Sequence, residues 1–139
     1  MHRKNIIHRD LKLANILLHF PFKSKSKCNF LLEENVIVEQ VFVVKLADFG
    51  FSREYNGMIQ SYCGTPINMA PEVLEKRLYN YKADLWSLGV VLFELITGEP
   101  PFNADNKKEL KLNIKKGVYK LPKFYKISEN CLDFVHNCL

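Results

Sequence analysis

The stretch H-R-D-L-K-L-A-N at residues 8–15 decides how this chain is interpreted, and D-F-G at residues 48–50 and A-P-E at residues 70–72 follow it in order. Six specified residues of the pattern H-R-D-L-K-x-x-N match by chance on the order of once in 10^7–10^8 start positions. Each motif alone is a weak indicator, whereas three motifs in this order are not a coincidence. We therefore interpret them together, as one signature.

Length and composition set the outer limits. A chain of 139 residues allows one domain at most, and 47% hydrophobic with 25% charged residues is typical of a globular protein. The longest strongly apolar segment, residues 85–96, is about half of the roughly 20 residues needed to cross a bilayer. No membrane span or secretory signal is expected, and four scattered cysteines without C-x-x-C spacing favour reduced thiols and a cytoplasmic location.

The net charge of +5 could indicate a nucleic-acid partner. However, the lysines of residues 107–126 are spread over a predicted helix and the loop after it, and no aromatic-interleaved basic motif accompanies them. A solvated basic face is the favoured interpretation, and no nucleic-acid partner is expected.

The three motifs resemble the signature of eukaryotic-type protein kinases. The runs C-G-T-P-I-N-M-A-P-E-V-L at residues 63–74 and Y-K-A-D-L-W-S-L-G at residues 81–89 are most similar to the autophagy-initiating, uncoordinated-type kinase group. Calcium/calmodulin-dependent and energy-sensing kinases share much of this pattern. Lys12 and G-T-P at residues 64–66 are typical of serine/threonine kinases rather than tyrosine kinases.

This resemblance implies a fold and an activity. The fold is the C-terminal lobe of a protein kinase, mainly α-helical with short β-hairpins and without the N-terminal lobe, so that residues 1–139 form a partial protein kinase domain. The activity is transfer of the γ-phosphate of ATP to serine or threonine hydroxyls of a protein substrate, with ATP and Mg2+ as cofactors.

The resemblance also implies roles for four residues of the signature. Asp10 is the catalytic base that accepts or orients the proton of the substrate hydroxyl, and Lys12 beside it offsets charge on the transferred phosphoryl group. Asn15 and Asp48 supply the oxygen ligands that Mg2+ prefers, and these two residues with Lys12 form the cofactor-binding set. An Asp or Asn in a loop is often only a turn cap. That alternative is weaker here because all four residues stand at the required offsets.

Residues 48–72 are expected to form the activation segment. By resemblance, Arg9 pairs with a phosphate carried by this segment, since arginine binds phosphate with two hydrogen bonds. The candidate acceptors are Ser52, Ser61, Tyr62 and Thr65, among which Ser61 occupies the usual place. An unmodified loop hydroxyl is the alternative for each of them.

A further group of residues is implied to support the site. His8 is a packed scaffold residue, and Phe49 and Gly50 complete the metal-binding turn, with the phenyl ring packed into the lobe. Glu72 pairs with an arginine of a later helix, expected beyond Leu139. Asp84 holds the backbone of the turn at residues 8–9, although an acidic residue at a helix start is also an ordinary capping choice.

Hydrophobic patterning predicts the elements around these motifs. Short apolar runs at residues 6–7, 16–18 and 41–46 predict strands near the catalytic loop at residues 8–15, and residues 51–69 are predicted to be an extended loop. The helix predicted at residues 83–97 is apolar nearly all round, which is typical of a helix buried on every side. Two further helices are predicted, one over residues 106–116 and one that Ser128 caps.

Residues 19–40 do not fit the family. Asn15 and Asp48 are 33 positions apart, whereas a hairpin loop has about 2–5 residues, so roughly twenty residues are extra. Because this insert carries K-S-K-S-K at residues 23–27, we expect it to be mobile and dispensable. Retained non-coding sequence and a docking loop are the alternatives.

Residues 1–139 contain no G-x-G-x-x-G loop and no V-A-I-K-type lysine, the parts that cradle the ATP phosphates. We therefore expect this stretch to belong to a longer kinase, to be inactive when purified alone, and to leave part of the helix at residues 83–97 exposed. The alternative, from a different functional class, is a catalytically inactive kinase lobe that acts only as a protein-interaction module.

Overall fold

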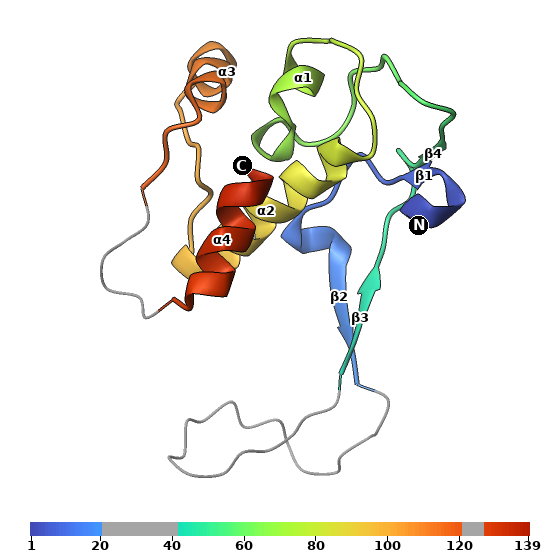
Figure 1. The fold of residues 1–139 in the computed structure, drawn as a ribbon, viewed down its shortest axis with the longest axis horizontal. Coiled ribbons are helices and arrows are strands. Elements are labelled where there is room, and N and C mark those ends of the chain that lie inside the picture. The colour runs from blue at the N-terminus through green and yellow to red at the C-terminus, as the bar shows by residue number, and fades with distance from the viewer. Residues whose placement is uncertain (21–41, 121–126) are drawn as a thin grey trace.

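A computed structural model of the chain describes residues 1–20, 42–120 and 127–139 (Figure 1). In chain order its elements are the 3-10 helix η1 (His2–Lys4), β1 (Ile6–Ile7), η2 (Leu13–Asn15), β2 (Ile16–His19), β3 (Val43–Leu46), β4 (Arg53–Glu54), η3 (Pro66–Asn68), α1 (Pro71–Leu74), α2 (Lys82–Thr97), α3 (Lys107–Lys116) and α4 (Glu129–Cys138). The mainly helical content with two small antiparallel sheets agrees with the fold class expected from the sequence.

The strands join distant parts of the chain on both sides of the catalytic loop. β1 pairs with β4, in the register Ile6 to Glu54, and β2 pairs with β3, from Ile16–Leu46 to His19–Val43. The strands predicted at residues 6–7 and 16–18 are therefore present. The prediction of an uninterrupted loop over residues 51–69 is wrong at β4 and η3, because β4 forms only through pairing with the distant β1.

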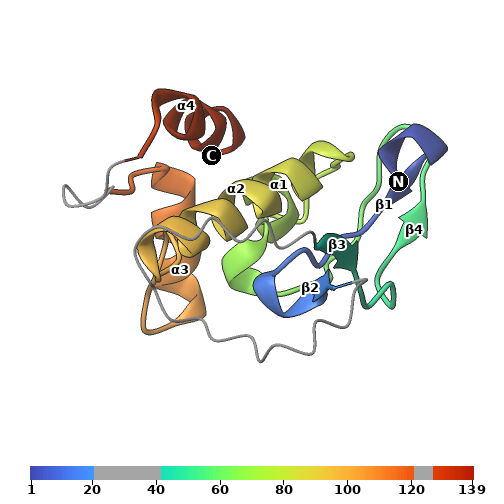
Figure 2. The same ribbon diagram turned by 90° about the horizontal axis from the view of Figure 1, so that it is seen from below.

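Helix α2 crosses the middle of the molecule and packs against α4 and η3 (Figure 2). It begins one residue before the predicted start and ends where Gly98 donates its backbone N–H to the carbonyl of Glu94. The prediction of burial on every side is wrong, since Leu95 is 64% exposed and Leu85 is also exposed. The prediction that part of this helix is exposed is confirmed. The physical reason is that, within the described residues, the outer part of α2 lines an open groove.

The buried core lies between α1, α2 and α3 and reaches the catalytic loop through Ile7. Trp86 of α2 stacks on Phe102 at 5.7 Å between ring centroids. Gly89 lets α4 approach closely, because a Cβ at this position would lie 2.6 Å from the Cβ of Cys138. Close packing of this kind leaves little freedom for α2, and α2 carries Asp84.

Helices α3 and α4 begin as the sequence predicts. The side chain of Asn106 accepts a hydrogen bond from the backbone N–H of Glu109, and the side chain of Ser128 accepts one from Cys131. The four-residue helix α1 was not predicted, because it is too short to show a hydrophobic period. No helix within the described ranges is long and apolar enough to span a membrane.

The insert predicted at residues 19–40 lies almost entirely outside the described residues. At its first position the structure differs from the prediction, because His19 is the last residue of β2 and pairs with Val43.

Candidate active site

The turn at the start of the catalytic loop is fixed by one buried carboxylate. Asp84, which is 1% exposed, accepts hydrogen bonds from the backbone N–H groups of His8 at 2.8 Å and Arg9 at 2.9 Å. Its Oδ2 also lies 2.8 Å from Nε2 of His2. Arg9 has a φ of 70°, a left-handed conformation that is uncommon for residues other than glycine. The bonds to Asp84 hold this turn, which is the contact that the resemblance implied.

His8 connects the catalytic loop to the segment before Asp48. Its ring is fully buried, Nε2 lies 3.1 Å from the carbonyl oxygen of Ala47, and Nδ1 lies 3.4 Å from the backbone N–H of Asp10. Because the carbonyl can only accept and the N–H can only donate, the ring proton is on Nε2. His8 therefore occupies a packed, hydrogen-bonded position, as expected for a scaffold residue.

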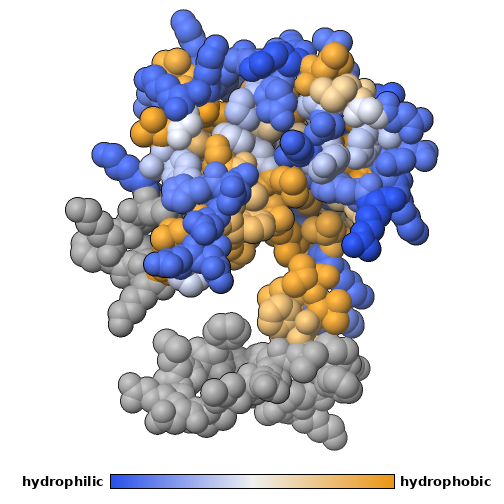
Figure 3. Space-filling model, in the orientation of Figure 1, coloured by the Kyte–Doolittle hydropathy of each residue, from blue (hydrophilic) through white to orange (hydrophobic). Residues whose placement is uncertain are grey.

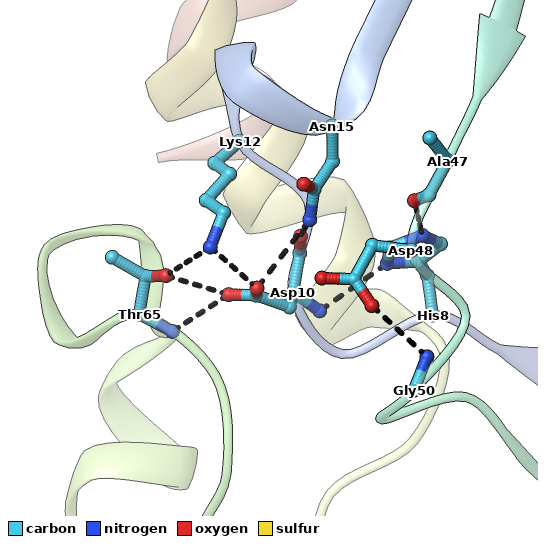
Figure 4. Close-up of polar contacts among 8 residues, drawn as sticks. All are labelled: His8, Asp10, Lys12, Asn15, Ala47, Asp48, Gly50 and Thr65. Atoms are coloured by element: carbon cyan, nitrogen blue, oxygen red, sulfur yellow. Dashed lines mark hydrogen bonds and ion pairs between the residues drawn. The ribbon is translucent and has the colours of Figure 1, made fainter.

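Asp10 lies at the centre of the site and is 3% exposed (Figure 4). Its Oδ1 accepts hydrogen bonds from Thr65, at 2.8 Å from the backbone N–H and at 2.7 Å from the hydroxyl. Its Oδ2 lies 2.8 Å from Nζ of Lys12 and 3.4 Å from Nδ2 of Asn15. Burial alone would raise the pKa of Asp10, but the hydrogen bonds from Lys12 and Thr65 and the Lys12 charge outweigh it, so the pKa lies below its ordinary value.

Lys12 and Thr65 close one side of this carboxylate. Nζ of Lys12 donates to the Thr65 hydroxyl at 3.2 Å as well as to Asp10. The segment carrying Thr65 comes this near because the preceding residue is Gly64, whose φ is 106° and whose added Cβ would lie 2.3 Å from the carbonyl oxygen of Arg9.

The contact between Thr65 and Asp10 was not predicted. Thr65 was predicted only to be a candidate phosphate acceptor and, within G-T-P, to be typical of the serine/threonine class. The glycine immediately before it was the one available signal of a close backbone approach.

Asn15 and Asp48 face the same side of the site from different elements. Nδ2 of Asn15 donates to the carbonyl of Asp10 at 2.9 Å, which orients the amide and leaves its oxygen available. The backbone carbonyl of Asn15 accepts a hydrogen bond from the backbone N–H of Ala47 at 2.9 Å. This bond joins the Asp48 turn to the catalytic loop. Asp48 is exposed, Gly50 donates to it at 3.2 Å, and its carboxylate points toward the catalytic loop (Figure 4).

This donor set suits a cation that keeps part of its water shell. Within the described ranges, no group of three or more His, Cys, Asp or Glu side chains could hold a metal by itself. One carboxylate and one amide oxygen match Mg2+, which is usually bound through one or two carboxylates together with phosphate oxygens. The residues present therefore fit Mg2+ bound jointly with a nucleotide.

Arg9 reaches into the following loop. Its Nε donates to the carbonyl of Phe51 and its Nη1 donates to the hydroxyl of Ser61 at 2.7 Å. The Ser61 hydroxyl is also hydrogen-bonded to the hydroxyl of the buried Tyr79 at 2.7 Å. A guanidinium and a phenol thus converge on Ser61, and Tyr79 was not among the predicted site residues.

The two remaining supporting residues are Phe49 and Glu72. Phe49 packs on His8 with ring centroids 5.1 Å apart, yet it is 53% exposed, so the expectation that it packs into the lobe holds for one face of the ring only. Glu72, in the first turn of α1, forms no ion pair within the described residues.

Known proteins are similar to this chain over most of its length. A family model described as "Protein kinase domain" matches residues 1–139. A Kluyveromyces marxianus protein named serine/threonine-protein kinase ATG1 is 41% identical over 143 residues, which cover 94% of this chain and 17% of that protein. The protein of the same name from Eremothecium gossypii is 39% identical over 137 residues, covering 95% of this chain and 14% of that protein. Mouse serine/threonine-protein kinase 33 is 43% identical over 122 residues, covering 84% of this chain and 23% of that protein. The chain thus spans less than a quarter of the length of each of these relatives.

Proposed function

Because the chain belongs to the protein kinase domain family, we propose that the protein transfers the γ-phosphate of ATP to serine and threonine hydroxyls of protein substrates. The predicted resemblance to serine/threonine kinases close to the ATG1 group is confirmed by relatives that carry these names at about 40% identity. The activity, the substrates and the location in the cytoplasm are our proposals, since the chain covers only part of each relative.

The observation that supports this activity best is the position of Asp10. Phosphoryl transfer requires a carboxylate that orients the attacking hydroxyl, and this carboxylate must be ionised to accept its proton. The lowered pKa of Asp10 keeps it ionised at neutral pH. Oδ1 accepts two short bonds from Thr65. Among the described residues, Oδ2 has one short contact, with Lys12, and a longer one of 3.4 Å with Asn15. Oδ2 is therefore the oxygen available to a substrate hydroxyl.

We assign the nucleotide and metal to the open side of the same site. Asn15, with its amide oxygen available, and Asp48, with its exposed carboxylate, would hold Mg2+ beside Asp10. Lys12 lies next to Asp10, where it would offset charge on the transferred phosphoryl group. When bound, Mg2+ neutralises the phosphate oxygens and draws charge away from the transferred group.

We propose further that residues 48–72 act as the activation segment of a partial kinase domain and that Ser61 is its phosphate acceptor. Arg9 already donates to the Ser61 hydroxyl, and a phosphate on this oxygen would strengthen the interaction by charge. The Thr65 hydroxyl, in contrast, is bonded to Asp10 and Lys12. We give Thr65 the role of positioning Asp10. No observation favours the alternative of a binding module without activity.

The test is to incubate the full-length protein with γ-labelled ATP, Mg2+ and a generic protein substrate, and to identify the labelled amino acids after hydrolysis. We expect label on phosphoserine and phosphothreonine, and loss of labelling when EDTA removes the metal. Labelling confined to phosphotyrosine, or binding of the substrate without any labelling, would refute the proposal.

A further inference from the structure

An open groove of about 790 Å³ lies between the loop after α1 and helix α3, away from Asp10. It is lined by Glu75, Arg77, Asn106, Lys108, Glu109, Lys111, Leu112 and Lys115. α1 and α3 pack side by side (Figures 1 and 2), and the surface over them is mostly hydrophilic (Figure 3). This α1–α3 groove has no role in the chemistry described above.

Helix α3 has one face toward the core and another face toward the groove. Ile114, which is 1% exposed, faces the core, and Leu110 packs beside it. On α3 the groove is lined instead by Glu109 and by residues 108, 111, 112 and 115. The last four have a spacing of i, i+3, i+4 and i+7 that places them on one helix face. Three of these are lysines and the fourth, Leu112, is 50% exposed. An apolar side chain among three positive charges thus forms this wall of the groove.

The lining of the groove carries four positive side chains and only two negative ones, Glu75 and Glu109, so its positive charge is not balanced. Glu75 is already paired with Arg77 and with Lys115, the latter at 3.4 Å, and the hydrogen bond from Arg77 lowers the pKa of Glu75. Lys108 and Lys111 form no ion pair within the described residues. Like charges three or four residues apart on a helix repel each other, so carboxylates supplied by another molecule would relieve this repulsion.

The groove adjoins the proposed activation segment. The carbonyl of Lys76, between Glu75 and Arg77, accepts a hydrogen bond from the side chain of Gln60 at 3.3 Å. Ile59 and Tyr79 exchange two backbone hydrogen bonds of 2.8 and 2.9 Å. Residues 53–69, α1 and α3 follow one another along one end of the molecule in Figure 1. A polypeptide substrate that extends beyond its phosphorylated residue therefore meets this groove at the same end of the molecule.

We propose that the α1–α3 groove docks an acidic segment of the protein substrate. Carboxylates of this segment pair with Lys108 and Lys111, and an apolar side chain packs on Leu112. The inference rests on the proposed kinase function, because it makes the docked protein the substrate. Two glutamates in the lining and the exposed leucine favour a polypeptide over nucleic acid or an anionic membrane, both of which present dense negative charge without apolar side chains between the charges.

The kinetic test uses the full-length protein and three peptides with the same acceptor serine. One is short, one carries a Gly/Ser linker and a Glu/Asp tract that contains a leucine, and one carries the same linker with a Gln/Asn tract. We expect a KM about tenfold lower for the acidic extension than for the neutral one, with kcat unchanged, and a smaller difference at high salt. The double variant K108E/K111E should remove the preference and leave the short peptide unaffected.

The matched control is K107E/K116E, which changes the charge of the same helix by the same amount at residues that do not line the groove. This variant should keep the preference for the acidic extension. Equal KM values for both extended peptides in an active wild-type protein would overturn the docking proposal and leave the kinase function standing. Loss of the preference in the control as strong as in K108E/K111E would also overturn it, since net charge alone would then explain the effect.

Binding without phosphorylation separates the two proposals. A labelled acidic peptide without serine, threonine or tyrosine should bind to the wild-type protein, and its Kd should rise at least tenfold in K108E/K111E. If the protein shows this binding but phosphorylates no substrate, the result would support peptide binding in the groove and refute the kinase function. If an oligonucleotide or a phosphatidylserine vesicle binds as tightly and is lost in the same variant, the acidic-protein assignment is wrong.

Discussion

The catalytic loop and the Asp48 turn lie side by side but are built in opposite ways. Asp10 of the catalytic loop and Asp84, which holds that loop from α2, are nearly inaccessible, and all four of their carboxylate oxygens accept hydrogen bonds from the protein. In the turn, the carboxylate of Asp48 is exposed and, among the described residues, takes a single hydrogen bond, from Gly50. The protein fixes the position of both carboxylates in the first region, whereas the carboxylate of Asp48 is held only through Oδ1 among the described residues.

This difference is what the proposed chemistry requires. A group that orients a substrate hydroxyl acts best when its own position is fixed before the substrate arrives. A carboxylate that binds a metal together with a nucleotide must instead keep its lone pairs available. We therefore expect mutations in the first region to change stability, and mutations in the second to change activity alone.

The largest loss of stability is expected for Asp84→Ala. This change leaves the buried backbone N–H groups of His8 and Arg9 without an acceptor, at about 1–3 kcal/mol each, so the free energy of unfolding should fall by about 3–5 kcal/mol. Denaturant titration of the full-length protein measures this free energy of unfolding. Asp133→Ala, at an exposed position of α4, is the control and should change stability by less than about 0.5 kcal/mol. A similarly small change for both variants would show that Asp84 does not hold the turn at residues 8–9.

Gly64→Ala should cost less, about 2–3 kcal/mol, because a positive φ and a contact with the Arg9 carbonyl act together. Gly57→Ala isolates the first effect, since Gly57 also has a positive φ, of 95°, but no atom lies near its added Cβ. It should cost about 1 kcal/mol. Equal losses in thermal denaturation would mean that Gly64 is not needed for the approach of Thr65 to Asp10.

A smaller effect is expected from the protonation of Asp10. Its pKa in the folded protein lies below the ordinary 3.8, so its contribution to stability is fully present above pH 3.8 and is lost as the pH falls through the lower, folded value. As the pH is lowered from 6 to 2, the denaturation midpoint should therefore fall more steeply for the wild type than for Asp10→Asn. Parallel curves would show that Lys12 and Thr65 do not stabilise the ionised carboxylate.

The smallest change in stability is expected for Asp48→Asn. Since the carboxylate is exposed and accepts one hydrogen bond, the free energy of unfolding should change by less than about 0.5 kcal/mol. A loss above about 2 kcal/mol in the same titration would show that the Asp48 turn supports the fold and is not an open ligand site.

Local sequence predicted the parts of this comparison that depend on local rules. The caps of Asn106 and Ser128, the stop at Gly98 and the strand at residues 16–18 follow from residue type and period. β4 and the bond between Thr65 and Asp10 could not be predicted in this way, because each joins residues about fifty positions apart. The role of Asp84 was reached only through resemblance, since no local pattern relates it to residues 8–9.

The most direct test of the account is the rate of phosphoryl transfer by Asp10→Asn and Asp48→Asn in the full-length protein. With saturating Mg2+-ATP and a serine peptide, we expect each variant to transfer phosphate at least about 100-fold more slowly than the wild type, because each lacks a carboxylate that acts in the transition state. The Asp48→Asn protein should meanwhile remain as stable as the wild type. Turnover within tenfold of the wild type for either variant would contradict the assignment of these two carboxylates.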